Sequence, residues 1–477
     1  MIFNSIDFGI FFFIVFVLYW IFFKNNIRNR NIFLILVSYF FYGWWDWRFL
    51  SLIIISSIVD YIAGKKIYEN NDNKKRKKWL LVSLVVNIGF LGFFKYFNFF
   101  ADSFVDAFTF FGTNFSPYRM NIILPVGISF YTFQTLSYTL DIYYKKLKPN
   151  NNIFAFFAFV SFFPQLVAGP IERAKDLLPQ FLEKSRINYE LLRSGLLLMA
   201  WGFLKKIVIA DRLAIYVDNA YANIDKLDNT TTIIAIIFFA FQLYLDFSAY
   251  SDIAIGSART LGFNLSTNFK RPYLSTSFSD FWKRWHISLS SWFKDYVYIP
   301  LGGNRKGKTK HIKNILIVFV LSGLWHGASW NFVIWGFLNA LFILIFDYFL
   351  GKTDKNIVKR IFTSLFISTL WALSLIFFRA QTFNDAIVMF SHLGDANKDI
   401  IYNFGLNSLE FSFTIKLLIA YVIFEIFQEK FEKIYEKFNS INFIFRWAVY
   451  ISIIGIILFF GSYGIGLNDN NFIYFQF

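Results

Sequence analysis

Long apolar runs, separated by short polar and mostly basic stretches, recur from one end of the chain to the other. They are residues 8–23, 31–64, 80–97, 122–143, 153–168, 192–210, 233–250, 315–350, 361–378, 413–427 and 445–460. Several are shorter than the ~20 residues that a full membrane crossing requires. Short membrane segments are typical of half-helices and re-entrant hairpins, which protein or a water-filled cavity must surround. The pattern predicts an all-α polytopic integral membrane protein with about ten to twelve membrane segments, some of them short or re-entrant.

Basic residues in the loops between these runs predict the topology. Three early clusters, at residues 24–30, 65–78 and 145–148, should all be cytoplasmic, because cytoplasmic loops carry an excess of lysine and arginine. The run at 31–64 must then turn back on itself, as a helical hairpin with its tip near Asp46. This arrangement places the N-terminus outside the cytoplasm. The basic loop at 302–313 should be cytoplasmic as well.

Composition and charge narrow the class of protein. The chain is 56% hydrophobic and only 16% charged, with a net charge of +16, whereas soluble domains carry roughly a quarter charged residues. The excess charge lies in membrane loops, so it reports orientation and not nucleic-acid binding. The first run lacks a basic region before it and a cleavage site after it, which favours a retained helix over a signal peptide. The longest candidate for a soluble segment, 380–411, is short, so we expect one membrane domain over residues 1–477.

The histidines are the first candidates for chemistry. There is no cysteine, which excludes disulfides, thiolate catalysis and cysteine metal sites. His326 lies in an otherwise apolar run, 13 residues after Lys313, and a helix would place it about 20 Å deep in a hydrocarbon core of about 30 Å. A histidine at that depth is costly and is a candidate for proton transfer. The alternative is a buried imidazole satisfied by a backbone carbonyl.

An aromatic, partly charged segment at 275–300 contains the second histidine, His286. Its aromatic residues recur at helical spacing, which predicts an amphipathic helix that lies at the interface or dips into the protein. Tryptophans at 282–292 favour a tunnel wall, and those at 44–47 favour an interfacial belt. Asp246 and Asp252 are expected at the end of an apolar helix, where a structural role is favoured.

Four motifs carry a resemblance to a known family. They are residues 281–305, 325–331, 163–173 and 244–252, and the likeness extends from the first helix to residues 472–477. The chain resembles the membrane-bound O-acyltransferases, and within them the bacterial alginate O-acetyltransferase type. The resemblance implies helices around a central catalytic tunnel. It also implies a multi-pass location in the bacterial cytoplasmic (inner) membrane.

The resemblance and the residues together give a set of expected site residues. His326 is the expected catalytic base, and His286 could orient it, bind an acyl oxygen or stabilise the fold. Residues expected to contact substrate or line the tunnel are Trp282, Trp285, Trp325, Asn331, Asp295 and Asp246. Basic residues that could bind a phosphorylated donor, or anchor helix ends at lipid headgroups, are Lys205, Lys206, Arg259, Lys270, Arg271 and the loop 305–313. No metal and no tightly bound cofactor are expected.

The expected reaction moves an acetyl group from a cytoplasmic thioester, such as acetyl-coenzyme A, across the membrane. The acceptor would be an extracytoplasmic polysaccharide, alginate or another surface glycan. The family resemblance implies a separate partner of the serine-histidine-aspartate esterase type that modifies the polymer. Three alternatives stay open: D-alanyl transfer to teichoic acid, a transporter without covalent chemistry, and a non-catalytic scaffold. Inverted repeats would favour a transporter, and the sequence shows none.

Overall fold

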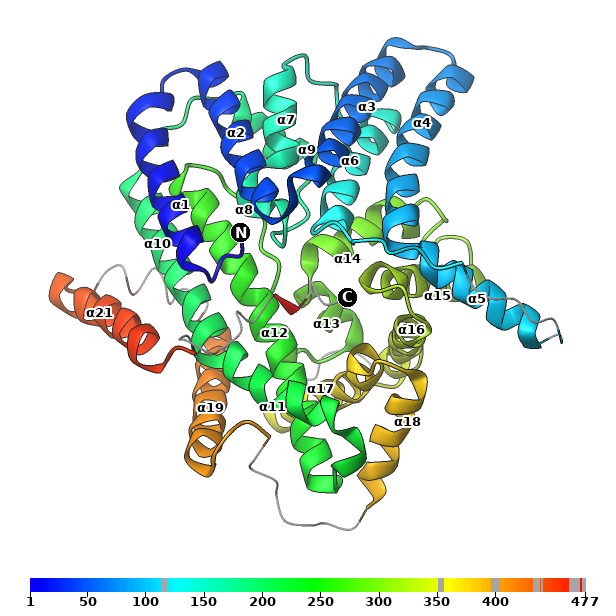
Figure 1. Cartoon of the computed structure of the whole chain (residues 1–477), viewed down its shortest axis with the longest axis vertical. Coiled ribbons are helices and arrows are strands. Elements are labelled where there is room, and N and C mark those ends of the chain that lie inside the picture. The colour runs from blue at the N-terminus through cyan, green and yellow to red at the C-terminus, as the bar shows by residue number, and fades with distance from the viewer. Residues whose placement is uncertain are drawn as a thin grey trace.

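Helices make up every regular element in the described part of the chain (Figure 1). The computed structural model describes residues 1–110, 112, 118–350, 356–395, 404–431, 438, 441–462 and 472–473. Residues 474–477 and part of the 380–411 stretch lie outside the described residues. The helical stretches long and apolar enough to cross a membrane are Ile6–Phe23, Ile27–Glu69, Asn73–Phe110, Asn229–Thr260, Trp330–Asp347, Ile357–Arg379 and Phe443–Phe460. These seven stretches of the described residues are typical of a multi-pass, all-α membrane protein.

The N-terminal third forms an antiparallel bundle. Its helices are α1 (Ile6–Leu18), α2 (Ile27–Asp46), α3 (Leu50–Glu69), α4 (Asn73–Leu91), α5 (Phe97–Phe110), α6 (Ile128–Tyr143) and α7 (Ile153–Ser161). One-turn π-helices η1 (Tyr19–Phe23) and η3 (Gly92–Tyr96) extend α1 and link α4 to α5. Two buried contacts show that α3 and α4 run antiparallel, because Ser56 donates to Asn87 over 2.6 Å and Ser83 donates to Asp60 over 2.5 Å. The hairpin predicted near Asp46 is confirmed, since α2 ends there and a short 3₁₀ turn, η2 (Trp47–Phe49), leads into α3.

Helix ends in this bundle alternate between two faces, and the three basic clusters share one of them. The Arg28 guanidinium lies over the Phe154 ring, 5.2 Å from its centroid. The Arg76 guanidinium donates to the Tyr143 carbonyl over 2.5 Å, beside the third cluster. The other face carries the N-terminus, whose Met1 ammonium donates to Phe41 near the end of α2 over 3.2 Å. A common face is what the topology requires, and its cytoplasmic location stays a prediction.

A long central helix, α12 (Asn229–Thr260), passes through the middle of the molecule (Figure 1). The elements that lead to it are α8 (Phe163–Leu166), α9 (Ala174–Leu177), η4 (Leu178–Phe181), α10 (Tyr189–Phe203), the π-helix η5 (Leu204–Ala210), α11 (Asp211–Ala222) and η6 (Ile224–Lys226). The expected position of Asp246 and Asp252 at a helix end is wrong, because α12 continues to Thr260. The helix accommodates these acids because adjacent lysines of η5 pair with them. Lys206 lies 2.8 Å from Asp246, and Lys205 lies 2.7 Å from Asp252.

The second half of the chain surrounds this helix with short and long helices. They are η7 (Pro272–Leu274), α13 (Phe278–Arg284), α14 (Ile287–Phe293), the π-helix η8 (Lys294–Tyr298), α15 (Lys308–His326), α16 (Trp330–Leu350), α17 (Ile357–Arg379), α18 (Phe383–Ser391), η9 (His392–Gly394), α19 (Ser408–Lys430) and α21 (Phe443–Phe460). The amphipathic segment predicted at 275–300 dips into the protein as α13, α14 and η8. It is broken at His286, where the backbone changes direction.

Candidate active site

His326 is the last residue of α15, and it is buried at the turn between α15 and α16. The two helices approach closely because glycines face each other: a Cβ on Gly323 would lie 2.1 Å from the Phe332 carbonyl oxygen. The imidazole lies among aromatic rings. Its centroid is 5.0 Å from those of Trp325 and Trp335. The apolar sequence of α15 therefore delivers one polar ring into an aromatic interior.

His286 occupies the junction between α13 and α14 and is also buried. Its backbone is left-handed, with φ 42° and ψ 55°, a conformation that non-glycine residues seldom adopt. The turn is held by Asn268, whose carbonyl accepts from Ile287 N–H and whose side chain accepts from the Ser288 hydroxyl, both over 2.9 Å. The imidazole centroid lies 4.6 Å from the Phe247 ring of α12.

The structure brings the two histidines together. Their ring centroids are 6.5 Å apart, although the residues come from separate motifs. The ring of Phe130, near the start of α6, lies beside both motifs. Its centroid is 6.4 Å from that of His286 and 5.4 Å from that of Trp325. Two imidazoles at this spacing are close enough to act on one small reacting group, one as a proton acceptor and the other as a hydrogen-bond donor.

Tryptophans form much of the surrounding wall. Trp282, Trp285 and Trp325 are all buried. Trp285 lies 4.9 Å from Trp371, and Trp282 lies 6.0 Å from Trp335. These tryptophans therefore form part of the wall around the two histidines. A continuous tunnel stays a prediction. The first patch is different, since Trp44 and Trp47 are 54% and 74% exposed, as an interfacial belt requires.

Three other expected site residues lie outside the pair of histidines. Asn331 is buried and its amide donates to the Ala380 carbonyl over 3.0 Å, which ties α16 to the end of α17. Asp295 is half-exposed and pairs with Arg173 at 3.4 Å. Asp246 accepts from Ile473 N–H over 2.8 Å in addition to its contact with Lys206. The contacts of these residues are structural, and substrate contact by any of them stays a prediction.

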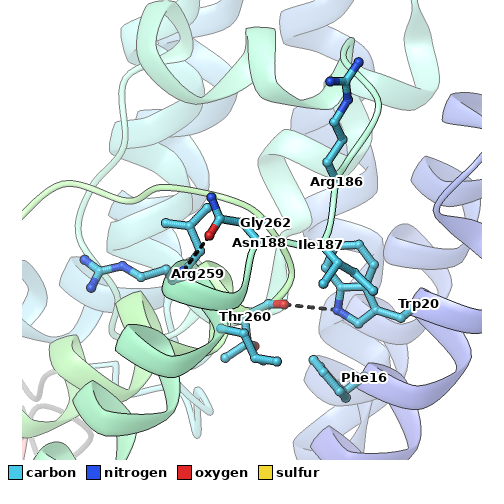
Figure 2. Close-up of a pocket in the computed structure, with 10 residues that line it drawn as sticks. Phe16, Trp20, Arg186, Ile187, Asn188, Arg259, Thr260 and Gly262 are labelled. Carbon is cyan, nitrogen blue, oxygen red and sulfur yellow. Dashed lines mark hydrogen bonds between the residues drawn. The ribbon is translucent and has the colours of Figure 1, made fainter. Parts of the chain in front are cut away.

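The basic residues that could bind a phosphorylated donor lie in different environments. Lys205 and Lys206 are buried in ion pairs, so they neither reach a headgroup nor line an open mouth. Arg271 pairs with Glu429 over 2.5 Å. Arg259 lies on the rim of an apolar cavity of about 110 Å³, where Trp20 donates to the Thr260 carbonyl. Figure 2 shows its guanidinium pointing away from Trp20.

The sequence did not lead to two residues that contact the segment around His326. Lys95 and Tyr96, at the end of η3, hydrogen-bond to backbone carbonyls of residues 324–326. The signal was present, because Lys95 is an ionisable residue inside an apolar membrane run. Such residues are costly and often mark function.

Comparisons with known proteins identify the family of the chain. The model of the MBOAT, membrane-bound O-acyltransferase family matches residues 144–384, which include both histidines. The chain is 39% identical over 379 residues to the probable alginate O-acetylase AlgI of Pseudomonas putida, covering 78% of this chain and 76% of the relative. It is 34% identical over 397 residues to the peptidoglycan O-acetyltransferase of Helicobacter pylori, covering 76% and 74%.

A more distant relative has another acyl group in its name. The teichoic acid D-alanyltransferase of Bacillus subtilis is 29% identical over 244 residues, which cover 48% of this chain and 60% of that protein. The family match and the O-acetyltransferase relatives make the protein an acyltransferase, which decides against a transporter or scaffold without covalent chemistry. The chain belongs to the membrane-bound O-acyltransferase family.

Proposed function

We propose that the protein moves an acetyl group from a cytoplasmic thioester to the outer side of the bacterial cytoplasmic membrane, for O-acetylation of a surface polysaccharide. The observation that carries the proposal is the convergence of His286 and His326, 6.5 Å apart, in a buried aromatic centre. Phe130, near the start of α6, and Lys95 of η3 contact this centre from the N-terminal bundle. The proposal requires that a donor reach it from the cytoplasmic side and an acceptor from the outer side.

His326 is proposed as the general base. In the reaction, the imidazole accepts the proton of an acceptor hydroxyl while the hydroxyl oxygen forms a bond to the acyl carbon. The carbon–sulfur bond then breaks, and the leaving thiolate takes a proton, so that the base is restored. General-base catalysis of this kind contributes about a hundred- to ten-thousand-fold. His286 is proposed to bind the acyl oxygen, because its imidazole lies in the same aromatic centre as His326.

The chemistry of thioesters supports the proposed donor, and the names of the relatives support the proposed acceptor. A thioester such as acetyl-coenzyme A supplies an activated acyl group. The mostly exposed basic residues at 305–313 offer cations for its phosphates, and they lie in the turn before α15 and in its first turns, where the sequence predicted a loop. The relatives named for alginate and peptidoglycan acetylation support a surface glycan as the final acceptor. We place an extracytoplasmic esterase-type protein between the enzyme and the polymer.

D-alanyl transfer to teichoic acid is the second candidate. A D-alanyltransferase matches about half of the chain, at lower identity than the acetylating relatives. D-alanyl is also an acyl group, so the pair of histidines serves either transfer. The acyl group itself therefore has to be identified by experiment.

The experiment compares cells that lack the protein with the same cells carrying the wild-type chain or His326→Gln. Surface polymers are washed, hydrolysed with mild base, and assayed for acetate and for D-alanine in the same sample. The proposal predicts base-labile acetate that appears only with the wild-type chain. Release of D-alanine in place of acetate would establish the second candidate, and release of neither would overturn both.

A further inference from the structure

The backbone around His326 forms the C-terminal end of α15, whose last carbonyls have no hydrogen-bond donor within that helix. α15 stops at His326, and Gly327 is already extended, with φ −160° and ψ 154°. The last carbonyls of a helix receive no hydrogen bond from a backbone N–H of the same helix. They also carry the negative end of the helix dipole, which a cation stabilises. In α15 these carbonyls belong to Leu324, Trp325 and His326.

Two adjacent side chains from another part of the chain occupy this helix end. The Lys95 ammonium donates to the Trp325 carbonyl over 2.8 Å and to the His326 carbonyl over 3.0 Å. The Tyr96 hydroxyl donates to the Leu324 carbonyl over 2.7 Å. Three successive carbonyls are thus held by two residues, about 230 positions earlier in the sequence.

The π-helix η3 explains how neighbours in sequence reach the same helix end. A single π-turn inserts into the continuous helix from α4 to α5, and such turns are often found at functional sites. The wider turn changes the direction of Lys95 and Tyr96 relative to the rest of α4. The cost of placing an ammonium in an apolar run is offset by its bonds to the carbonyls of the residue proposed as base.

We propose that Lys95, assisted by Tyr96, is a positioning residue that fixes the direction of the His326 imidazole. The known contacts of Lys95 are with backbone oxygens, so it acts through the segment that it holds. A small displacement of a catalytic group can cost about a hundredfold in rate. The activity part of this inference rests on the proposed function, and the structural part does not.

The test uses Lys95→Met, Lys95→Arg and Tyr96→Phe in the full-length protein in lipid nanodiscs. Methionine removes the charge and keeps an unbranched chain, whereas arginine keeps a cation. Lys77→Met is the control, because Lys77 is an exposed lysine on α4. Release of the coenzyme A thiol from acetyl-coenzyme A, with a soluble polysaccharide supplying the acceptor hydroxyl, gives kcat and KM. Hydrogen exchange followed by mass spectrometry measures the amides of residues 324–330.

We expect Lys95→Met to lower kcat at least about tenfold while KM for acetyl-coenzyme A changes less than about twofold. Amide exchange should become faster in residues 324–330, with the melting temperature near that of the control. Arginine should restore much of kcat, and Tyr96→Phe should have a smaller effect than Lys95→Met. Wild-type kcat or unchanged exchange in Lys95→Met would overturn the inference, as would equal losses in the methionine and arginine variants. If the unsubstituted protein transfers no acetyl group, the proposed function fails, and the exchange result still decides the role of Lys95.

Discussion

At the scale of single residues, His286 has an unfavourable backbone conformation, and its imidazole is packed among aromatic rings. Its left-handed backbone, with φ 42°, costs an L-residue about 1–2 kcal/mol. The ring packs against Phe247 and lies 5.6 Å from Trp325. Strained residues persist when the surrounding structure holds them, and they are frequent at active sites. The hydrogen bonds of Asn268 to Ile287 and Ser288 hold the backbone at this position.

His286→Asn should fold and lose activity, since asparagine tolerates left-handed backbone better than other non-glycine residues. His286→Ala should lose activity and also melt several degrees lower, because alanine leaves a cavity in the aromatic packing and keeps the strain. Melting curves in detergent and acyl-transfer rates separate the two effects. If His286→Asn turns over at the wild-type rate, the residue is structural.

At the scale of elements, the hairpin of α15 and α16 fixes where His326 lies. Gly323 and Gly336 allow backbone contact between the helices: the Cβ of an alanine at 323 would lie 2.1 Å from the Phe332 oxygen, and one at 336 would lie 2.2 Å from the Phe319 oxygen. The sequence showed a histidine inside an apolar run. It did not show that the run 315–350 turns back on itself after His326, since small residues predict close approach without naming the helix that approaches.

Gly323→Ala should destabilise the protein, with about 1–3 kcal/mol as the usual range for overpacking. The loss of acyl transfer should exceed that expected from unfolding, because the hairpin carries His326. Gly455→Ala in α21 is the matched control, since nothing lies within 4 Å of its added Cβ. Equal melting temperatures for the two variants would contradict the close packing of α15 on α16.

The ion pairs between η5 and α12 give a second prediction at this scale. Lys206 contacts both Asp211 and Asp246 at 2.8 Å, and all three are buried. Loss of one partner from a buried pair costs about 3–5 kcal/mol, so Lys206→Met should be severely destabilised. Lys205→Met should lose less, because its partner Asp252 is partly exposed. Denaturation in detergent gives the order, and adding Asp246→Asn should restore part of the loss in Lys206→Met.

At the scale of the whole molecule, the sequence predicted the class of fold and the hairpin at Asp46. It also singled out two histidines that the structure brings close together, and their catalytic roles stay predictions. Hydrophobic periodicity and charged loops carry those features. The length of α12 was missed because Lys205 and Lys206, which neutralise its acids, lie some forty residues earlier. Lys95 was missed as part of the site for the same reason: its bonds join residues far apart in sequence. Contacts of this kind become visible only once the helices are packed.

The common face of the basic clusters can be tested because the chain has no native cysteine. Single cysteines at Lys75 and Arg305 should react with a membrane-impermeant maleimide only after cells are permeabilised. A cysteine at Trp47, which is 74% exposed at the opposite end of α2, should react in intact cells. The reverse pattern would place the basic face outside and would invert the proposed direction of transfer.

The most direct measurement is the acyl-transfer rate of purified His326→Gln and His326→Ala in nanodiscs, beside the wild-type protein, with melting temperature and acetyl-coenzyme A binding measured on the same samples. Removal of a general base predicts a fall of about a hundred- to ten-thousand-fold in kcat, with stability and donor binding close to wild type in the glutamine variant. A folded glutamine variant that retains most of the wild-type rate would contradict the assignment of His326 as the base.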